Sequence, residues 1–161
     1  MSGGFFMIIM WKKFLLCLAI PLGVGGLSAL LTSGNMQIFE EINKPPLSPP
    51  GWLFPVVWTI LYALMGVALY IVVMAKDNKS NLPAYISFGV QLFFNFFWSI
   101  IFFNAKAYLF AFIWLVFLWV AIIANIYFFY KVSKTAGKIL IPYLLWVTFA
   151  GYLNFGIYLL N

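Results

Sequence analysis

The stretch KPPLSPPGWLFPVVWTILY, residues 44–62, places five prolines and two tryptophans directly before a long apolar segment. Proline lacks a backbone N–H and is tolerated in turns and in the first turn of a helix. The stretch therefore predicts a stiff loop that runs into a helix. We expect Ser48 to cap this helix, with Pro49 and Pro50 in its first turn. Pro55 is expected to lie deeper, where it deletes one backbone hydrogen bond and bends the helix.

The composition is that of a membrane protein, because 66% of the residues are hydrophobic and 7% are charged, against about 25% charged in soluble domains. The charges divide the chain into five charge-free intervals, each at least as long as the roughly 20 residues that a helix needs to cross a bilayer. This pattern predicts an all-α integral membrane protein, a five-transmembrane-helix bundle in a single domain. The expected spans are 11–33, 50–75, 82–104, 107–130 and 138–160, with an outer loop at 34–49.

The lysines predict the orientation of the bundle. Seven of them fall on one side of a five-span arrangement, and two, Lys44 and Lys106, fall on the other. The positive-inside rule then places the N-terminus in the cytoplasm and the C-terminus outside a cell membrane. The lysines mark span ends and form no basic face, which argues against nucleic acid as a partner.

A cleaved signal peptide is disfavoured because the first apolar run, residues 14–31, is too long, and whether residues 1–9 are native is left open.

The residue inventory excludes most catalytic chemistry. The chain has no histidine, and no acidic residue lies within an expected span. Catalytic triads, zinc sites and intramembrane proton relays need such groups, so no metal site is expected. Cys17 is the only cysteine, which excludes an intramolecular disulfide. Any chemistry must therefore rely on aromatic residues and a bound cofactor.

Three polar or amphipathic residues of the third span share one helical face. Gln91, Asn95 and Trp98 are spaced i, i+4, i+7, which places them on one stripe. A polar side chain inside a membrane needs a partner or a cavity. The stripe therefore indicates interhelical hydrogen bonds, contact with a ligand, or both.

The fifth span combines a bulky and a small residue on one face. Trp146, Phe149, Ala150, Leu153 and Asn154 follow helical spacing, so an indole borders a small side chain and an amide. This arrangement predicts a notch in the helix surface. The alternative for the tryptophan is an interfacial belt position, about two turns from the cytoplasmic end.

The second span contributes a tryptophan at the mouth of the bundle and another on its wall. Trp58 and Tyr62 stand at i, i+4, and Trp58 lies about 9 Å further along the helix axis than Trp52. In the first span, Gly25 and Ala29 form a small-xxx-small pair that indicates close helix packing.

The motifs KPPLSPPGWLFPVVWTILY, QLFFNFFWSIIFF and PYLLWVTFAGYLN together resemble the TspO/MBR family of translocator and tryptophan-rich sensory proteins. The resemblance implies a bundle of five helices, usually a homodimer in membrane lipid, with an aromatic pocket beneath the first outer loop. It implies that the protein binds porphyrins, namely protoporphyrin IX and, as a further candidate, haem. It also implies binding of isoquinoline-type drugs, and it implies no obligatory cofactor. The residues that match the family's pocket are Trp52, Trp58, Tyr62, Asn95, Trp98, Trp146, Phe149 and Ala150.

The resemblance implies a sensor or transport role in tetrapyrrole or stress handling. The alternative is a light- and oxygen-dependent enzyme that degrades porphyrin with Trp58 and Trp146, and a structural subunit without a ligand is a third hypothesis. The porphyrin propionates are expected to reach Lys44, Lys106 or the positive start of the second helix at Gly51.

Three departures from the family pattern affect what can be transferred. Residues 55–58 read Pro-Val-Val-Trp where relatives often read Gly-Pro-Val-Trp, which moves the expected bend one residue earlier. Phe110 stands where animal relatives have a tryptophan. The animal cholesterol motif is replaced by Phe155, Tyr158 and Leu159, so cholesterol binding is not transferred.

Overall fold

The computed structural model describes residues 9–75 and 81–161. Its elements are α1 (Trp11–Thr32), α2 (Ile38–Glu41), α3 (Leu53–Met74), α4 (Leu82–Ser99), the π-helical turn η1 (Ile100–Asn104), α5 (Tyr108–Val132), α6 (Lys134–Ile139) and α7 (Ile141–Leu160). Five helical segments in this part of the chain are long and apolar enough to cross a membrane, with η1 extending α4 and α6 preceding α7 in the last. The predicted five-helix fold is confirmed.

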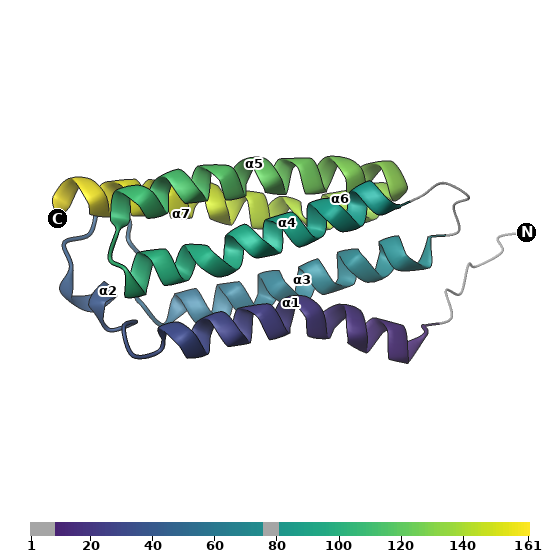
Figure 1. The fold of residues 1–161 in the computed structure, drawn as a ribbon, viewed down its shortest axis with the longest axis horizontal. Coiled ribbons are helices and arrows are strands. Elements are labelled where there is room, and N and C mark those ends of the chain that lie inside the picture. Colours follow the sequence, from purple (N-terminus) through teal and green to yellow (C-terminus); the bar gives the residue numbers. More distant parts are fainter. Residues whose placement is uncertain (1–8, 76–80) are drawn as a thin grey trace, which may run out of the picture.

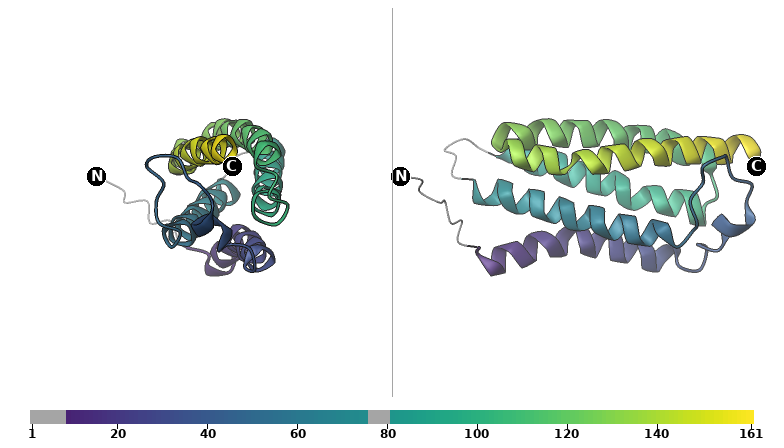
Figure 2. Two further views of the ribbon diagram at one scale, coloured as in Figure 1. Left: turned by 90° about the vertical axis from the view of Figure 1, so that its left-hand side faces the viewer. Right: turned by 180° about the vertical axis from the view of Figure 1, so that it is seen from behind.

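The long helices run side by side, and α1 begins at the end of the bundle opposite to the end of α7 (Figure 1). The main packing pairs are α1 with α3, α4 with α5, and α5 with α7. Viewed from the end that carries α2, the segment between α1 and α3 arches across the bundle toward α7 (Figure 2). This segment, residues 33–52, is called the outer loop below. It covers one end of the bundle.

Three details predicted for the start of α3 are wrong, and the first is that Pro49 and Pro50 precede the helix instead of lying in its first turn. The helix begins at Leu53 and has no side-chain cap. The Ser48 hydroxyl donates instead to the carbonyl oxygen of Pro45, at 2.7 Å, and stabilises a turn of the outer loop. Pro55 is the third helical residue, in the first turn, where a backbone N–H has no intrahelical partner to lose. It therefore deletes no hydrogen bond and gives no reason for a bend.

Among the described residues, Pro21 in the middle of α1 is the proline that lies beyond the first turn of its helix, and Figure 1 shows a bend in α1 there. Because proline has no N–H, the carbonyl of Cys17 loses its intrahelical partner. Gly66 of α3 lies against this region. A Cβ at Gly66 would lie 2.7 Å from Leu18 Cα and 3.0 Å from the Cys17 carbonyl oxygen. The glycine therefore allows the backbones of α1 and α3 to approach closely.

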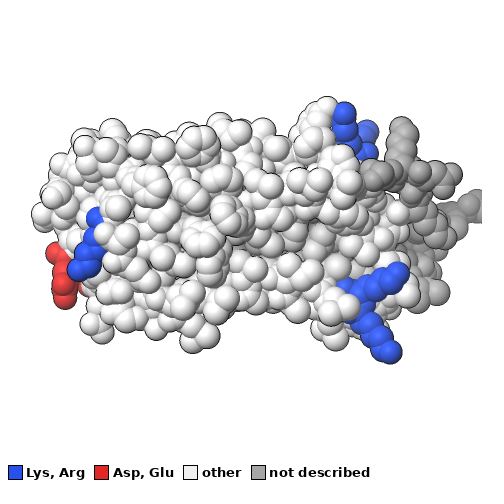
Figure 3. All heavy atoms as spheres, viewed as in Figure 1, with Lys and Arg blue, Asp and Glu red and all other residues white. Residues whose placement is uncertain are grey.

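The charges gather at the two ends of the bundle (Figure 3). Both described acidic residues, Glu40 and Glu41, belong to the outer loop. The lysines at the start of α1 and around the junction of α5 and α6 lie at the opposite end. Lys76 and Lys79, which also entered the predicted orientation, lie outside the described residues.

Candidate ligand-binding site

A cavity of about 120 Å³ lies beneath the outer loop, between α1, α3, α4, η1 and α7. Phe39 of α2 and Met36 contribute to the lining from the outer loop. The rest of the lining is apolar and aromatic apart from a few hydroxyl and amide groups. It contains no charged side chain, as expected for a site that takes an apolar ligand.

Trp58 forms the aromatic wall of the cavity together with the rings of Tyr62 and Trp98, and the ring of Tyr143 packs against Trp58 from outside the lining. The Trp58 ring stacks on Tyr62 at a centroid distance of 5.7 Å and an interplanar angle of 30°. It lies 6.2 Å from Trp98 and 6.3 Å, edge-on, from Tyr143. No hydrogen bond joins the Trp58 indole nitrogen to another described residue. The indole donor of Trp58, which lines the cavity, is thus free for a guest molecule.

A chain of buried hydrogen bonds runs away from the cavity wall across α3, α4 and α7. The Tyr62 hydroxyl donates to the Asn95 side-chain oxygen, at 2.5 Å. The Asn95 side-chain nitrogen donates to the Tyr143 hydroxyl at 2.7 Å, and that hydroxyl donates to Gln91 at 2.8 Å. All four residues are buried. Both ends of the Asn95 amide are therefore occupied before any ligand arrives.

A second polar link connects α4 to α7 and α5. The Trp98 indole nitrogen donates to the Asn154 side-chain oxygen at 3.1 Å. The Asn154 nitrogen donates to the backbone carbonyl of Tyr108 at 2.8 Å. Of the two interpretations of the stripe in the third span, interhelical hydrogen bonding therefore holds for Asn95, Gln91 and Trp98. Asn95 and Trp98 also line the cavity.

The structure brings five of the eight predicted site residues together. The residues that line the cavity are Trp58, Tyr62, Asn95, Trp98 and Ala150. Trp52 does not line the cavity and is 67% exposed, immediately before the start of α3. The other two, Trp146 and Phe149, do not line the cavity.

Trp146 is separated from the cavity by the ring of Phe54. Phe54 lines the cavity and contacts Trp146 edge-on at 5.8 Å, and Phe149 packs behind Trp146 at 5.6 Å. The Trp146 indole nitrogen is buried without a hydrogen-bond partner. Trp146 is thus one ring away from a ligand in the cavity.

Sequence reasoning missed Tyr143, which is 1% exposed. The buried face of α7 contains Tyr143, Val147, Ala150 and Asn154, at i, i+4, i+7, i+11. The face predicted for α7, centred on Trp146 and Ala150, is rotated about the helix axis relative to this buried face. The sequence does contain a sign of Tyr143, because helical spacing extends from Ala150 back to it.

Sequence reasoning also missed the contribution of α1 and η1. Ser28 and Thr32, at i, i+4 near the end of α1, line the cavity. The hydroxyls of Ser28 and Ser99 are joined by a hydrogen bond. The π-helical turn adds Phe102 and Phe103 to the lining. The serine and threonine spacing could have indicated this wall, whereas the π-helical turn has no clear sequence pattern.

A second hollow, of about 220 Å³, adjoins the cavity at the outer loop and is called the vestibule below. Four side chains line both spaces, so they form the partition between them: Met36, Phe39, Phe54 and Phe103. The vestibule is also lined by Gln37, Glu40 and Gly51. A molecule larger than the cavity would extend into the vestibule once these side chains move.

The outer loop is fastened to the end of α7. The backbone N–H of Asn43 donates to the Asn161 side-chain oxygen at 3.1 Å, and the Asn161 side-chain nitrogen donates to the Asn43 carbonyl at 2.8 Å. The Tyr152 hydroxyl donates to the Pro46 carbonyl at 2.8 Å. Pro45 packs on Gly156 so closely that a Cβ there would collide with its ring. These contacts hold the loop closed over the cavity.

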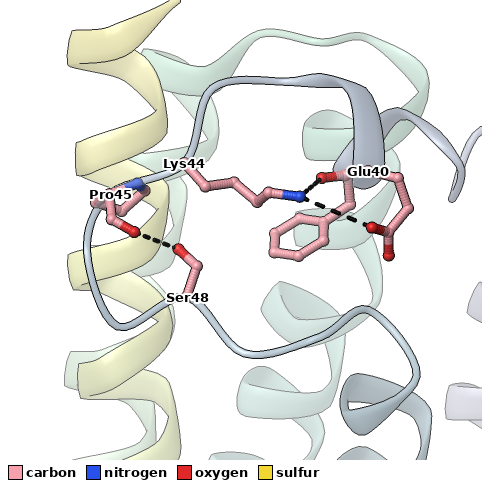
Figure 4. Close-up of polar contacts among 5 residues, drawn as sticks. Glu40, Lys44, Pro45 and Ser48 are labelled. Carbon is pink, nitrogen blue, oxygen red and sulfur yellow. Dashed lines mark hydrogen bonds and ion pairs between the residues drawn. The ribbon is translucent and has the colours of Figure 1, made fainter.

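The three groups expected to receive ligand carboxylates were Lys44, Lys106 and the start of α3, and none of them is free at the edge of the cavity. The Lys44 ammonium donates to the Phe39 carbonyl at 2.7 Å and lies 3.8 Å from a Glu40 oxygen (Figure 4). The other Glu40 oxygen lies against Gly51, at the start of α3. Lys106 is exposed and lines neither the cavity nor the vestibule. The chain's own carboxylate thus stands at the helix start where a ligand carboxylate was expected.

The fold and the site define an integral membrane protein of five helices with an aromatic cavity beneath a closed outer loop. The model of the TspO/MBR family matches residues 17–160, and the chain belongs to this family. It is 40% identical over 149 residues to the tryptophan-rich protein TspO of Chlorobaculum tepidum, covering 91% of this chain and 94% of that one. It is 32% identical over 141 residues to the translocator protein of Homo sapiens, with coverages of 86% and 83%. The predicted family is confirmed.

Proposed function

We propose that the cavity binds flat, apolar molecules: porphyrins such as protoporphyrin IX, and isoquinoline-type drugs. The observation that carries this proposal is the wall formed by Trp58 with Tyr62 and Trp98, in a lining without charge. Planar aromatic ligands gain from offset stacking on such rings in addition to the burial of apolar area. The free indole donor of Trp58 supplies an orienting polar contact of the kind that such sites use sparingly.

The volumes indicate how a macrocycle would be accommodated. Sites for drug-sized ligands usually measure about 300 Å³ or more, whereas the cavity and the vestibule measure about 120 and 220 Å³. A porphyrin therefore requires both spaces. Entry displaces the partition side chains, Phe39 and Phe54 among them, and opens the outer loop. Binding by this route is coupled to a movement of the loop.

We propose that the protein senses or transports its ligand in tetrapyrrole or stress handling. A relative from Cereibacter sphaeroides, 34% identical over 151 residues, is named tryptophan-rich sensory protein. The relative in Homo sapiens is named translocator protein. Those names support a role in which the bound molecule is detected or handed on. We further propose that the protein resides in the cell membrane with the outer loop on the external side, because most lysines lie at the opposite end.

The binding proposal is tested with protein purified in detergent and titrated with protoporphyrin IX, using quenching of tryptophan fluorescence. Trp58→Ala is expected to weaken binding about tenfold or more, because it removes a stacked ring of the wall. Trp119→Ala is the matched control, since Trp119 lies on the outer surface and bonds Thr148. Unchanged affinity in Trp58→Ala, or an equal loss in Trp119→Ala, would contradict the proposal. Stabilisation by ligand against heat provides a second measurement.

A second candidate function is light- and oxygen-dependent breakdown of the bound porphyrin. It is favoured by two indoles without hydrogen-bond partners at the site: that of Trp58 on the wall and that of Trp146 behind Phe54. In this reaction oxygen is the oxidant and the porphyrin is oxidised, with the indoles exchanging electrons with the photoexcited ligand. The double variant Trp58→Phe, Trp146→Phe should bleach protoporphyrin more slowly than the wild type at equal occupancy. Bleaching of protoporphyrin by the double variant at the wild-type rate would contradict this function.

A further inference from the structure

Glu40 is the only charged side chain among the described residues that line the cavity or the vestibule. It belongs to α2, and its side chain is 66% exposed. The other vestibule residues are apolar or uncharged, with aromatic rings from Phe39, Phe54 and Phe103. The edge of a ligand that extends from the cavity into the vestibule therefore meets a single carboxylate.

The surroundings of Glu40 fix where this negative charge acts. One carboxylate oxygen lies against Gly51 at the start of α3, in the space that a Cβ of residue 51 would need. The other faces the Lys44 ammonium at 3.8 Å (Figure 4). That ammonium makes its shorter contact with the Phe39 carbonyl and lies 4.8 Å above the Phe39 ring. Lys44 does not line the vestibule, so the carboxylate is the charge that a ligand encounters first.

We propose that Glu40 is a selectivity residue that makes the site favour tetrapyrroles with an uncharged edge over those that carry free carboxylates. This inference rests on the proposed function, because it requires a macrocycle that extends from the cavity into the vestibule. A ligand carboxylate in the vestibule is repelled by Glu40 and competes with it for Lys44 and for the positive start of α3. A ligand whose edge is esterified or otherwise neutral is not repelled by Glu40 and does not compete with it for Lys44 or the start of α3.

The test compares protoporphyrin IX with its dimethyl ester, which has the same macrocycle and no carboxylate charge. Glu40→Gln should tighten binding of the free acid about threefold to tenfold, a range that fits a partly exposed charge. It should leave the affinity for the ester within about twofold, since the stacking surface is unchanged. The ratio of the two dissociation constants is the measured quantity. The exposed ion pair to Lys44 contributes little to stability, so the variant is expected to fold.

Glu41→Gln is the matched control, because it removes the same charge one residue along the chain from an exposed side chain outside the vestibule. It should leave the ratio unchanged.

Gly51→Ala is a second variant that displaces the Glu40 carboxylate without removing it, and it should move the ratio in the same direction as Glu40→Gln. Equal shifts in Glu40→Gln and Glu41→Gln, or an unaltered ratio in Glu40→Gln, would overturn the inference while leaving binding itself intact. Failure of both porphyrins to bind the wild type would overturn the proposed function and this inference with it.

Discussion

The side-chain nitrogen of Asn95 donates a hydrogen bond of 2.7 Å to the hydroxyl of Tyr143, which joins α4 to α7 behind the cavity wall. Because the oxygen of the same amide accepts from Tyr62, Asn95 connects three helices through one side chain. The amide therefore serves the architecture of the site first. A ligand that takes the place of the Tyr62 hydroxyl on Asn95 must displace a ring that is also part of the stacking wall.

Replacing Asn95 by leucine should destabilise the bundle by about 1–2 kcal/mol. The substitution keeps an apolar volume but leaves the Tyr62 hydroxyl without a partner and removes one of the two hydrogen bonds of the Tyr143 hydroxyl. Interhelical hydrogen bonds in membranes contribute up to about this amount. Reversible unfolding in mixed micelles measures the change. Asn104→Leu is the control, because Asn104 also bonds to another helix but is exposed. It should change stability by about 0.5 kcal/mol or less, and a loss as large as that of Asn95→Leu would contradict the special role of the buried network.

Gly66→Ala should destabilise the protein by about 1–3 kcal/mol, the usual cost of overpacking. The added methyl group would collide with the backbone of α1 at Leu18, near the bend at Pro21, and a backbone yields less readily than a side chain. Gly89→Ala is the matched control, since a Cβ at this helical glycine of α4 meets no atom within 4 Å. That variant should be unchanged or up to about 1 kcal/mol more stable. Equal thermal unfolding of the two variants would show that α1 and α3 are not packed as closely as described.

The fold could be predicted because charge is so expensive inside a bilayer that the lysines mark the span ends. The finer features depend on packing, which a single sequence does not display. The beginning of α3 at Leu53 is decided by the outer loop, where Ser48 bonds to Pro45 instead of capping a helix. The bend at Pro21 was not predicted, although a proline in the middle of a helix is itself a sign of one.

The candidate site could be predicted in part for a similar reason. Helical spacing places Trp58 with Tyr62 and Asn95 with Trp98 correctly, since each pair belongs to one helix. The orientation of α7 depends on its neighbours, and the helix turns Tyr143 inward while Trp146 stays behind Phe54. Spacing alone defines a stripe, but it does not say which of two adjacent stripes faces the cavity.

Asn161→Ala should accelerate both entry and release of a bound porphyrin about threefold to tenfold. The variant removes two hydrogen bonds that fasten the outer loop at Asn43, and a loss of about 1 kcal/mol in the closed state raises the open population roughly fivefold. The affinity should change by less than about twofold, because the closed state is weakened equally with and without ligand. Stopped-flow fluorescence measures both rates. Ser33→Ala is the control, since the Ser33 hydroxyl bonds to the carbonyl of Leu30, one turn back in α1, and not to α7. Unaltered rates in Asn161→Ala would show that the loop does not limit access.

The orientation of the bundle can be tested with single cysteines, because Cys17 is the only native one and is buried. In a Cys17→Ala background, Ser33→Cys introduces a thiol at the outer-loop end and Thr135→Cys introduces one at the lysine-rich end; both positions are exposed. With five described lysines at one end and only Lys44 and Lys106 at the other, the charge bias places the outer loop outside. A membrane-impermeant maleimide added to intact cells should therefore label Ser33→Cys and spare Thr135→Cys, and inside-out vesicles should show the reverse. Labelling of Thr135→Cys in intact cells would invert the orientation, and the vestibule with Glu40 would then open toward the cytoplasm.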